Sequence, residues 1–230
     1  FYGWFLDSAC TIPVADSSVV TTAGDHTLYA GWRINTYKIT YDLNGGSGTM
    51  SPTEYNINGS DKLPTPTREG YTFAGWKATA VAGNWTINKV YSAGTSLKGM
   101  YGNVTLTAQW TPNTNTKYTV RHYVMSVDNR TDFVLSATDN LTGTTGAELT
   151  LANLIKSSLL VANGIYYQEG KVGGSVVAKT TISADGKLVI DLYYYRTQYK
   201  VTFNNNGGHT SGSTDTGSKT YTYNYGHKEL

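Results

Sequence analysis

The chain has 230 residues, which is enough for one large domain or two to three small ones. Its 18 Lys and Arg balance its 16 Asp and Glu and lie scattered, which argues against a nucleic-acid partner. No apolar stretch approaches the roughly 20 residues that span a bilayer, so we expect no membrane segment, and the 19 Tyr and 25 Gly favour strands and tight turns. The chain does not begin with Met, and no charged-then-apolar leader precedes Phe1, so we expect an excised or processed fragment. Its single cysteine, Cys10, excludes a disulfide within the chain.

The first segment, residues 1–34, is repeated later in the chain. Phe1–Trp4 matches Phe73–Trp76, and His26–Trp32 matches Val104–Trp110. The Trp anchors lie 28 residues apart in the first copy (32 − 4) and 34 apart in the second (110 − 76), which an insertion in a loop explains. Self-similarity of this kind predicts a repeat architecture, in which the first segment is the C-terminal half of one repeat.

Residues 35–112 are interpreted as one complete repeat. Leu106, Ala108 and Trp110 alternate with polar residues, as in a strand with one buried face. An Asn-Gly-Gly sequence at 44–46 follows the first expected strand and favours a tight turn. The strands expected in this repeat lie at about 37–43, 53–57, 72–78, 84–87 and 104–110.

A different module, residues 117–197, follows a short linker rich in Thr, Asn and Pro. Alternating apolar residues predict strands at 118–124 and 186–196. Residues 150–160 predict one short helix, with Asn163-Gly164 as its stop signal. The apolar residues with helical spacing are Leu151, Leu154, Ile155 and Leu159. Strands at both ends with one helix between them predict a small α+β module.

Residues 198–230 match the start of the complete repeat, because Tyr199–Gly208 resembles Tyr37–Gly46. We interpret them as the N-terminal half of a further repeat. Together with residues 1–34 they are complementary, lacking only the equivalent of Pro64–Thr72. Half-repeats with open strand edges favour pairing between chains, so we expect head-to-tail self-association through the two termini.

The repeat motifs carry a family resemblance. Tyr37–Gly46, Pro66–Trp76 and Val104–Trp110 together resemble the Listeria–Bacteroides repeat, also called the internalin B-type B repeat. The resemblance implies a mainly β or α+β chain of tandem β-grasp (ubiquitin-like) modules, displayed outside the cell on the surface or wall of Gram-positive bacteria. Such repeats act as stalks of adhesins and supply no catalytic residues.

The middle module resembles a mucin-binding-protein repeat. The resemblance rests on Tyr118–Val124, Leu141–Gly146 and Leu192–Arg196. The helix expected at 150–160 departs from that pattern. The resemblance implies a further β-grasp module, and with it an alternative function in binding a host surface protein or glycan.

Candidate residues for catalysis are sparse. No histidine has a second ligand at useful spacing and no cysteine cluster joins them, so we expect no metal site, no cofactor and no enzyme. A pocket that holds a histidine beside a carboxylate would revive the enzyme hypothesis. Each histidine is expected to be structural or solvated, with His122 facing solvent or a neighbouring module; the four are His26, His122, His209 and His227.

The densest aromatic cluster is the candidate ligand-contact patch. Alternation along a strand places Tyr193 and Tyr195 on one face and Tyr194 on the other, and Tyr166 and Tyr167 complete the cluster. One face is expected to pack in a core, while the other offers apolar area with polar tips to a glycan or protein. The sequence thus favours a non-catalytic stalk or spacer, with ligand binding through the middle module as the alternative.

Overall fold

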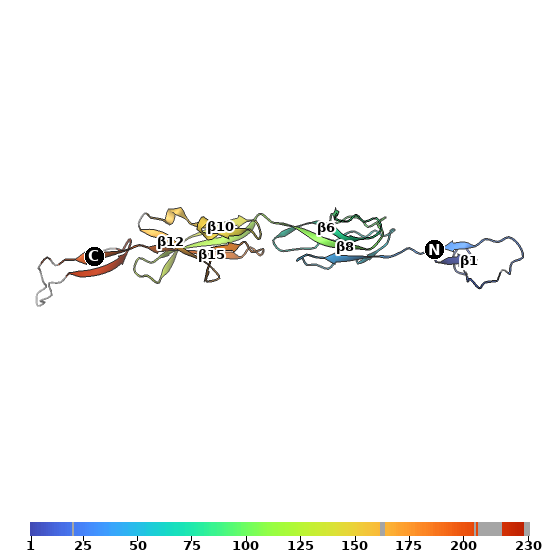
Figure 1. Cartoon of the computed structure of the whole chain (residues 1–230), viewed down its shortest axis with the longest axis horizontal. Coiled ribbons are helices and arrows are strands. Elements are labelled where there is room, and N and C mark those ends of the chain that lie inside the picture. Colours follow the sequence, from blue (N-terminus) through green and yellow to red (C-terminus); the bar gives the residue numbers. More distant parts are fainter. Residues whose placement is uncertain (20, 162–163, 205, 207–217, 228–230) are drawn as a thin grey trace. The chain divides into compact units, whose positions relative to one another are not determined.

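The computed structural model describes the whole chain except residues 20, 162–163, 205, 207–217 and 228–230. It divides into two compact units. The first comprises Phe1–Arg68 and Phe73–Trp110, and the second comprises Glu69–Thr72 and Thr111–Leu230. The described residues form strands and short turns, so the predicted mainly β class is confirmed (Figure 1). No helix in this part of the chain is long and apolar enough to cross a membrane.

The segment 1–34 forms a small three-stranded antiparallel sheet in the order β2-β1-β3. Its strands are β1 (Gly3–Phe5), β2 (Pro13–Val14) and β3 (Tyr29–Gly31). The Phe5 side chain is buried against Gly31, where an added Cβ would lie 2.4 Å from the ring. The face that bears Trp4 remains exposed.

The complete repeat forms a mixed five-stranded sheet in the order β5-β4-β8-β6-β7. Its strands are β4 (Tyr37–Asp42), β5 (Glu54–Tyr55), β6 (Tyr71–Val81), β7 (Val90–Tyr91) and β8 (Val104–Pro112). The first and last strands, β4 and β8, are neighbours and run parallel, with register pairs from Ile39↔Val104 to Asp42↔Thr107. Figure 1 labels β6 and β8 in this repeat.

The motif tryptophans lie in and beside the core of this repeat. Trp76 has no exposed surface, and its indole Nε1 donates to the carbonyl of Pro64 at 2.8 Å. The indole of Trp110 donates to the carbonyl of Leu43 at 3.1 Å. These hydrogen bonds satisfy the polar atom of each large apolar side chain, which is what burial of Trp requires.

The prediction of a strand at 84–87 is wrong. This stretch forms turns, and the strand begins later, as β7 at Val90–Tyr91. Gly83 and Asn88 adopt positive φ values of 69° and 64° on either side of the stretch 84–87. Trp85 is nevertheless buried, and its Nε1 donates to the Tyr55 hydroxyl at 2.7 Å. An aromatic anchor in a loop therefore produced an apolar pattern that resembles a strand.

The middle module is built on a second mixed five-stranded sheet, in the order β10-β9-β15-β12-β13 (Figure 1). Its strands are β9 (Thr116–Met125), β10 (Phe133–Gly143), β12 (Ile165–Val172), β13 (Ser175–Val176) and β15 (Leu188–Arg196). The strands β11 (Glu148–Thr150) and β14 (Lys179–Thr181) form a separate antiparallel pair. Here too the first and last strands of the large sheet, β9 and β15, are parallel neighbours, paired from Leu188↔Tyr118 to Tyr194↔Val124.

The helix expected at 150–160 is wrong. The segment forms two short 3₁₀ turns, η1 (Leu151–Leu154) and η2 (Ser157–Leu159). Ile155 and Lys156 between them are extended, with ψ values of 129° and 99°. The backbone N–H of Lys156 donates to the Tyr194 hydroxyl at 2.9 Å, so a tertiary bond replaces a helical one. Helices this short are marginal in isolation, and tertiary contacts decide the outcome.

The last segment is an antiparallel hairpin of β16 (Gln198–Phe203) and β17 (Lys219–Asn224). The pairing Tyr199↔Tyr223 has the same place as Tyr37↔Tyr55 in the complete repeat. The Asn-Gly-Gly sequence at 206–208, which matches 44–46, and the predicted stop signal Asn163-Gly164 lie partly outside the described residues.

Candidate functional site

The open face of the middle module's large sheet carries an aromatic surface. The register of β9 and β15 places Tyr123 beside Tyr193, and their rings stack with centroids 5.3 Å apart. Phe133 packs edge-on against Tyr193 and Tyr195, at 5.0 and 5.1 Å. Tyr166 lies 6.3 Å from Tyr195. We call Tyr123, Phe133, Tyr166, Tyr193 and Tyr195 the aromatic face.

Charged side chains flank the aromatic face. Arg121 forms a two-pronged ion pair with Asp191, with N–O distances of 2.6 and 2.8 Å. Lys171 Nζ lies 2.9 Å from the Glu169 carboxylate and 4.5 Å from the centroid of the Tyr193 ring. Hydrogen bonding to Glu169 raises the pKa of Lys171, and burial raises the pKa of Tyr193. Apolar rings between charges that are held in place suit stacking on a sugar ring or a protein side chain.

The five tyrosines of the predicted patch divide between the two faces of the sheet. Tyr166, Tyr193 and Tyr195 belong to the aromatic face, and Tyr166 is exposed. Tyr194 has no exposed surface, and Tyr167 packs against the same core with its ring centroid 6.1 Å from that of Tyr194. Tyr194 and Tyr167 are therefore core residues and do not share a surface with the other three.

Sequence reasoning missed Tyr123 and Phe133. The alternation of the strand 118–124 does place Tyr123 on the face of the strand that is turned away from the buried Tyr118. Its neighbours, however, depend on the parallel pairing of strands some 70 residues apart, which no local pattern indicates.

His122 lies beside a carboxylate, with its side chain fully buried. Its Nδ1 is 2.9 Å from the Tyr194 hydroxyl and its Nε2 is 3.1 Å from Asp139 Oδ2. Lys156 Nζ in turn contacts both oxygens of Asp139, at 2.7 and 3.0 Å. Burial lowers the pKa of His122, and hydrogen bonding to Lys156 lowers that of Asp139.

The expectation that His122 faces solvent or a neighbouring module is wrong, because its side chain is fully buried. No substrate can reach an imidazole with no exposed surface. The network instead satisfies every polar atom of a histidine that the sheet register directs into the core. His209 lies outside the described residues.

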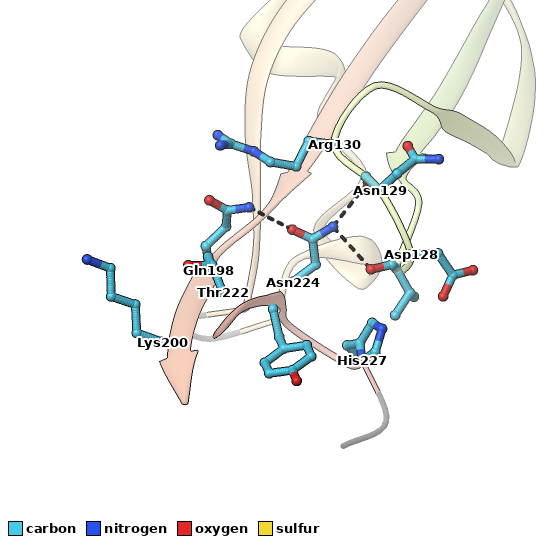
Figure 2. A pocket seen from close by; sticks show the side chains of 10 residues that line it. Asp128, Asn129, Arg130, Gln198, Lys200, Thr222, Asn224 and His227 are labelled. Atoms are coloured by element: carbon cyan, nitrogen blue, oxygen red, sulfur yellow. Dashed lines mark hydrogen bonds between the residues drawn. The ribbon is translucent and has the colours of Figure 1, made fainter. Parts of the chain in front are cut away.

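A polar groove of about 520 Å³ lies between the loop 127–130 and the β16–β17 hairpin (Figure 2). Asn224 is buried at its centre, and its carboxamide Nδ2 lies 3.0–3.1 Å from the carbonyls of Ser126, Val127 and Asn129. Gln198 Nε2 donates to Asn224 Oδ1 at 3.0 Å.

Figure 2 shows Lys200 and Arg130 at the rim of this groove, pointing away from Asn224. Within the groove, Asn224 and Gln198 bond to each other, and Asn224 also bonds to backbone carbonyls of the loop. This arrangement fixes the hairpin to the loop. Among the described residues, no group of three or more His, Cys, Asp or Glu side chains is arranged to hold a metal ion.

Comparison with known proteins identifies the repeat. The family model of the Listeria-Bacteroides repeat domain matches residues 1–31 and 37–109. Internalin H of Listeria monocytogenes is 37% identical over 94 residues, which cover 40% of this chain and 16% of that protein. A protein of Evansella cellulosilytica described as a Gly-rich membrane protein is 39% identical over 77 residues, which cover 33% of this chain and 9% of that protein. The chain thus spans less than a sixth of the length of these relatives.

Proposed function

Because the chain belongs to the Listeria–Bacteroides repeat family through residues 1–31 and 37–109, we propose that it is a non-catalytic repeat region of a bacterial cell-surface protein, acting as the stalk of an adhesin. The proposal includes display outside the cell on a Gram-positive wall. It also includes division into modules at 1–34, 35–112, 117–197 and 198–230. The mixed sheet with parallel central strands supports a β-grasp fold for the complete repeat.

One observation carries the stalk proposal: the first and last strands of each large sheet are parallel neighbours. A pull on the two ends of such a module draws the strands past each other along their length. All hydrogen bonds between the two strands are then loaded together, in shear, instead of opening one by one. This geometry resists extension, as a spacer between a cell and its target must.

Single-molecule stretching of the 230-residue chain tests the proposal. Successive N–H groups of β4 point to opposite neighbours. The N–H of Lys38 donates to the Asn103 side chain, next to β8, and the N–H of Ile39 donates to the Thr53 carbonyl, next to β5. The N–H of Thr40, the next residue, therefore points toward β8. Thr40→Pro removes this donor. We expect Thr40→Pro to lower the unfolding force of the complete repeat and of no other module. Thr40→Ala, which keeps the N–H, should leave that force unchanged. Modules that extend without a resolved force peak would reject the stalk role.

The aromatic face supports a second candidate function, the binding of a host glycan or surface protein through residues 117–197. Half-buried stacked rings flanked by charges, with the exposed Tyr166 beside them, are the specific observation. In a glycan array or host-protein pull-down, Tyr193→Ala should abolish the signal of the full chain. Val189→Ala is the matched control, since Val189 alternates onto the same face of β15. A blank result with the unaltered chain would count against this function.

A further inference from the structure

The segment that replaces the expected helix is held to the sheet of the middle module by a single residue. We call residues 155–160 the strap. Among the described residues, all hydrogen bonds that join the strap to the rest of the chain come from Lys156. Its backbone N–H donates to the Tyr194 hydroxyl at 2.9 Å, and its Nζ lies 2.7 and 3.0 Å from the two carboxylate oxygens of Asp139. The attachment of the strap therefore depends on the state of these two partners.

His122 bonds to both partners of Lys156, so the four residues form a closed ring of hydrogen bonds. A backbone N–H can only donate, so the Tyr194 oxygen accepts from Lys156 and the Tyr194 O–H donates to His122 Nδ1. The other ring nitrogen, Nε2, then carries the hydrogen of the neutral imidazole and donates to Asp139. With a neutral imidazole, each of these buried polar atoms has a partner.

A second proton on the imidazole disturbs both attachments of Lys156. Nδ1 then becomes a donor toward the Tyr194 oxygen, and the Tyr194 O–H loses its acceptor although the side chain has no exposed surface. The new positive charge also competes with the Lys156 ammonium group for the single Asp139 carboxylate. Protonation therefore weakens the backbone bond and the side-chain bond of the strap together.

The surroundings of His122 allow it to titrate while its carboxylate partner stays ionised. Three described elements bring a titratable side chain toward the imidazole: β10 brings Asp139, β15 brings Tyr194 and the strap brings Lys156. On β12, Tyr167 packs on the Tyr194 ring, with centroids 6.1 Å apart. The residues before and after His122 in β9 point to the opposite face of the sheet. Hydrogen bonding to Lys156 lowers the pKa of Asp139, so Asp139 remains charged in the pH range in which the imidazole gains its proton.

The strap forms one wall of an apolar groove. This groove has a volume of about 520 Å³, and its lining includes Leu159 of the strap, Val134 of β10 and Ile165 of β12. Val134 is 62% exposed, so the strap covers this side of the sheet only in part. Leu151, which precedes the strap, has no exposed surface and gives the segment a fixed point. Release of Lys156 therefore moves the strap about Leu151 and opens the groove at the wall that Leu159 forms.

We propose that the strap is an acid-sensitive latch: protonation of His122 releases Lys156 and opens the apolar groove beside Leu159. A buried imidazole favours its neutral form, so the latch is closed at neutral pH and opens in acid. Apolar surface of the middle module then becomes accessible only where the surroundings are acidic. The latch lies on the opposite side of the sheet from the aromatic face, so it can fail or hold independently of the stalk role and of ligand binding.

Amide hydrogen exchange of the 230-residue chain tests the latch. Rates at roughly pH 5 and pH 7.5, corrected for the intrinsic effect of pH on exchange, are compared for the strap and for β9 and β15. We expect protection of the strap to fall about tenfold or more at the lower pH, while β9 and β15 keep theirs. His122→Gln keeps a donor and an acceptor but does not titrate, so it should remove this difference. A strap that is equally protected at both pH values, or a loss that is equal in the strap and the two strands, overturns the proposal.

A second variant tests the attachment without altering the buried histidine. Lys156→Met keeps the backbone N–H but removes the ammonium group, so the strap should exchange faster already at pH 7.5. Lys179→Met is the matched control, because Lys179 on β14 forms a similar 2.7 Å ion pair with Glu148 on β11, outside the strap. The apolar dye anilinonaphthalene sulfonate should bind the unaltered chain more strongly at pH 5 than at pH 7.5. Equal strap exchange in the two lysine variants, or dye binding that does not rise in acid, refutes the latch.

Discussion

Replacement of Trp76 by Phe is the sharpest test of how the repeat motif stabilises the fold. The change leaves the Pro64 carbonyl without its 2.8 Å donor, which costs about 1–3 kcal/mol. It also removes part of a fully buried ring system, which adds about 1–2 kcal/mol for the cavity that remains. The expected loss in unfolding free energy of the complete repeat is therefore about 2–5 kcal/mol.

Urea unfolding followed by far-ultraviolet circular dichroism measures this loss without relying on Trp fluorescence. With a slope of about 1 kcal/mol/M for a module of this size, the midpoint of one transition should fall by about 2 M or more. The matched control is Trp4→Phe, at the same motif position but 49% exposed, studied at concentrations where the chain is monomeric. Equal effects of the two substitutions, or a loss below about 1 kcal/mol for Trp76→Phe, would show that burial of the motif is not what stabilises the repeat.

Three further outcomes are expected. Burial lowers the pKa of His122 below its ordinary value of 6.5, so the unfolded chain binds the proton more readily than the folded chain. The free energy of unfolding should therefore fall as the pH drops below about 6.5. His122→Gln should weaken this pH dependence, measured as urea midpoints from pH 5 to 8. Gly83→Ala should lower the melting temperature far more than Gly94→Ala: both have positive φ, but only at Gly83 would the new Cβ meet backbone, 2.1 Å from the Tyr101 carbonyl oxygen. Asn224→Ala should release the hairpin from the loop 126–129 and speed amide exchange in β17, and unchanged protection would contradict the tethering role.

Local patterns were sufficient where one face of a strand is buried. The alternation at 104–110 and 186–196 predicted β8 and β15 because a buried face imposes a period of two. The prediction at 150–160 was wrong although Leu151, Leu154 and Leu159 have helical spacing. The backbone N–H of Leu151 bonds to the Ala178 carbonyl and that of Lys156 to the Tyr194 hydroxyl, so these groups find partners outside a helix. The spacing of apolar residues indicates which side chains are buried. It does not indicate which acceptors the backbone N–H groups bond to.

The candidate surfaces could be predicted only in part. A run of three tyrosines on a strand indicates two on one face, and Tyr193 and Tyr195 do share the aromatic face. The burial of His122 and the tether at Asn224 both depend on partners that are distant in sequence, at Tyr194 and in the loop 126–129. Such pairs have no local signature, because the register between distant strands decides which side chains meet.

The parallel pairing of first and last strands also determines how a module joins a tandem array. The chain enters at one end of β4 and leaves at the opposite end of β8, so the two points at which the complete repeat joins its neighbours lie at opposite ends of its sheet. A nine-residue strand such as β8 spans about 30 Å. In the proposed stalk, a gain or loss of whole modules would change the length in fixed steps and leave the fold of each remaining module intact. Copy number, and not new sequence, would then set that length.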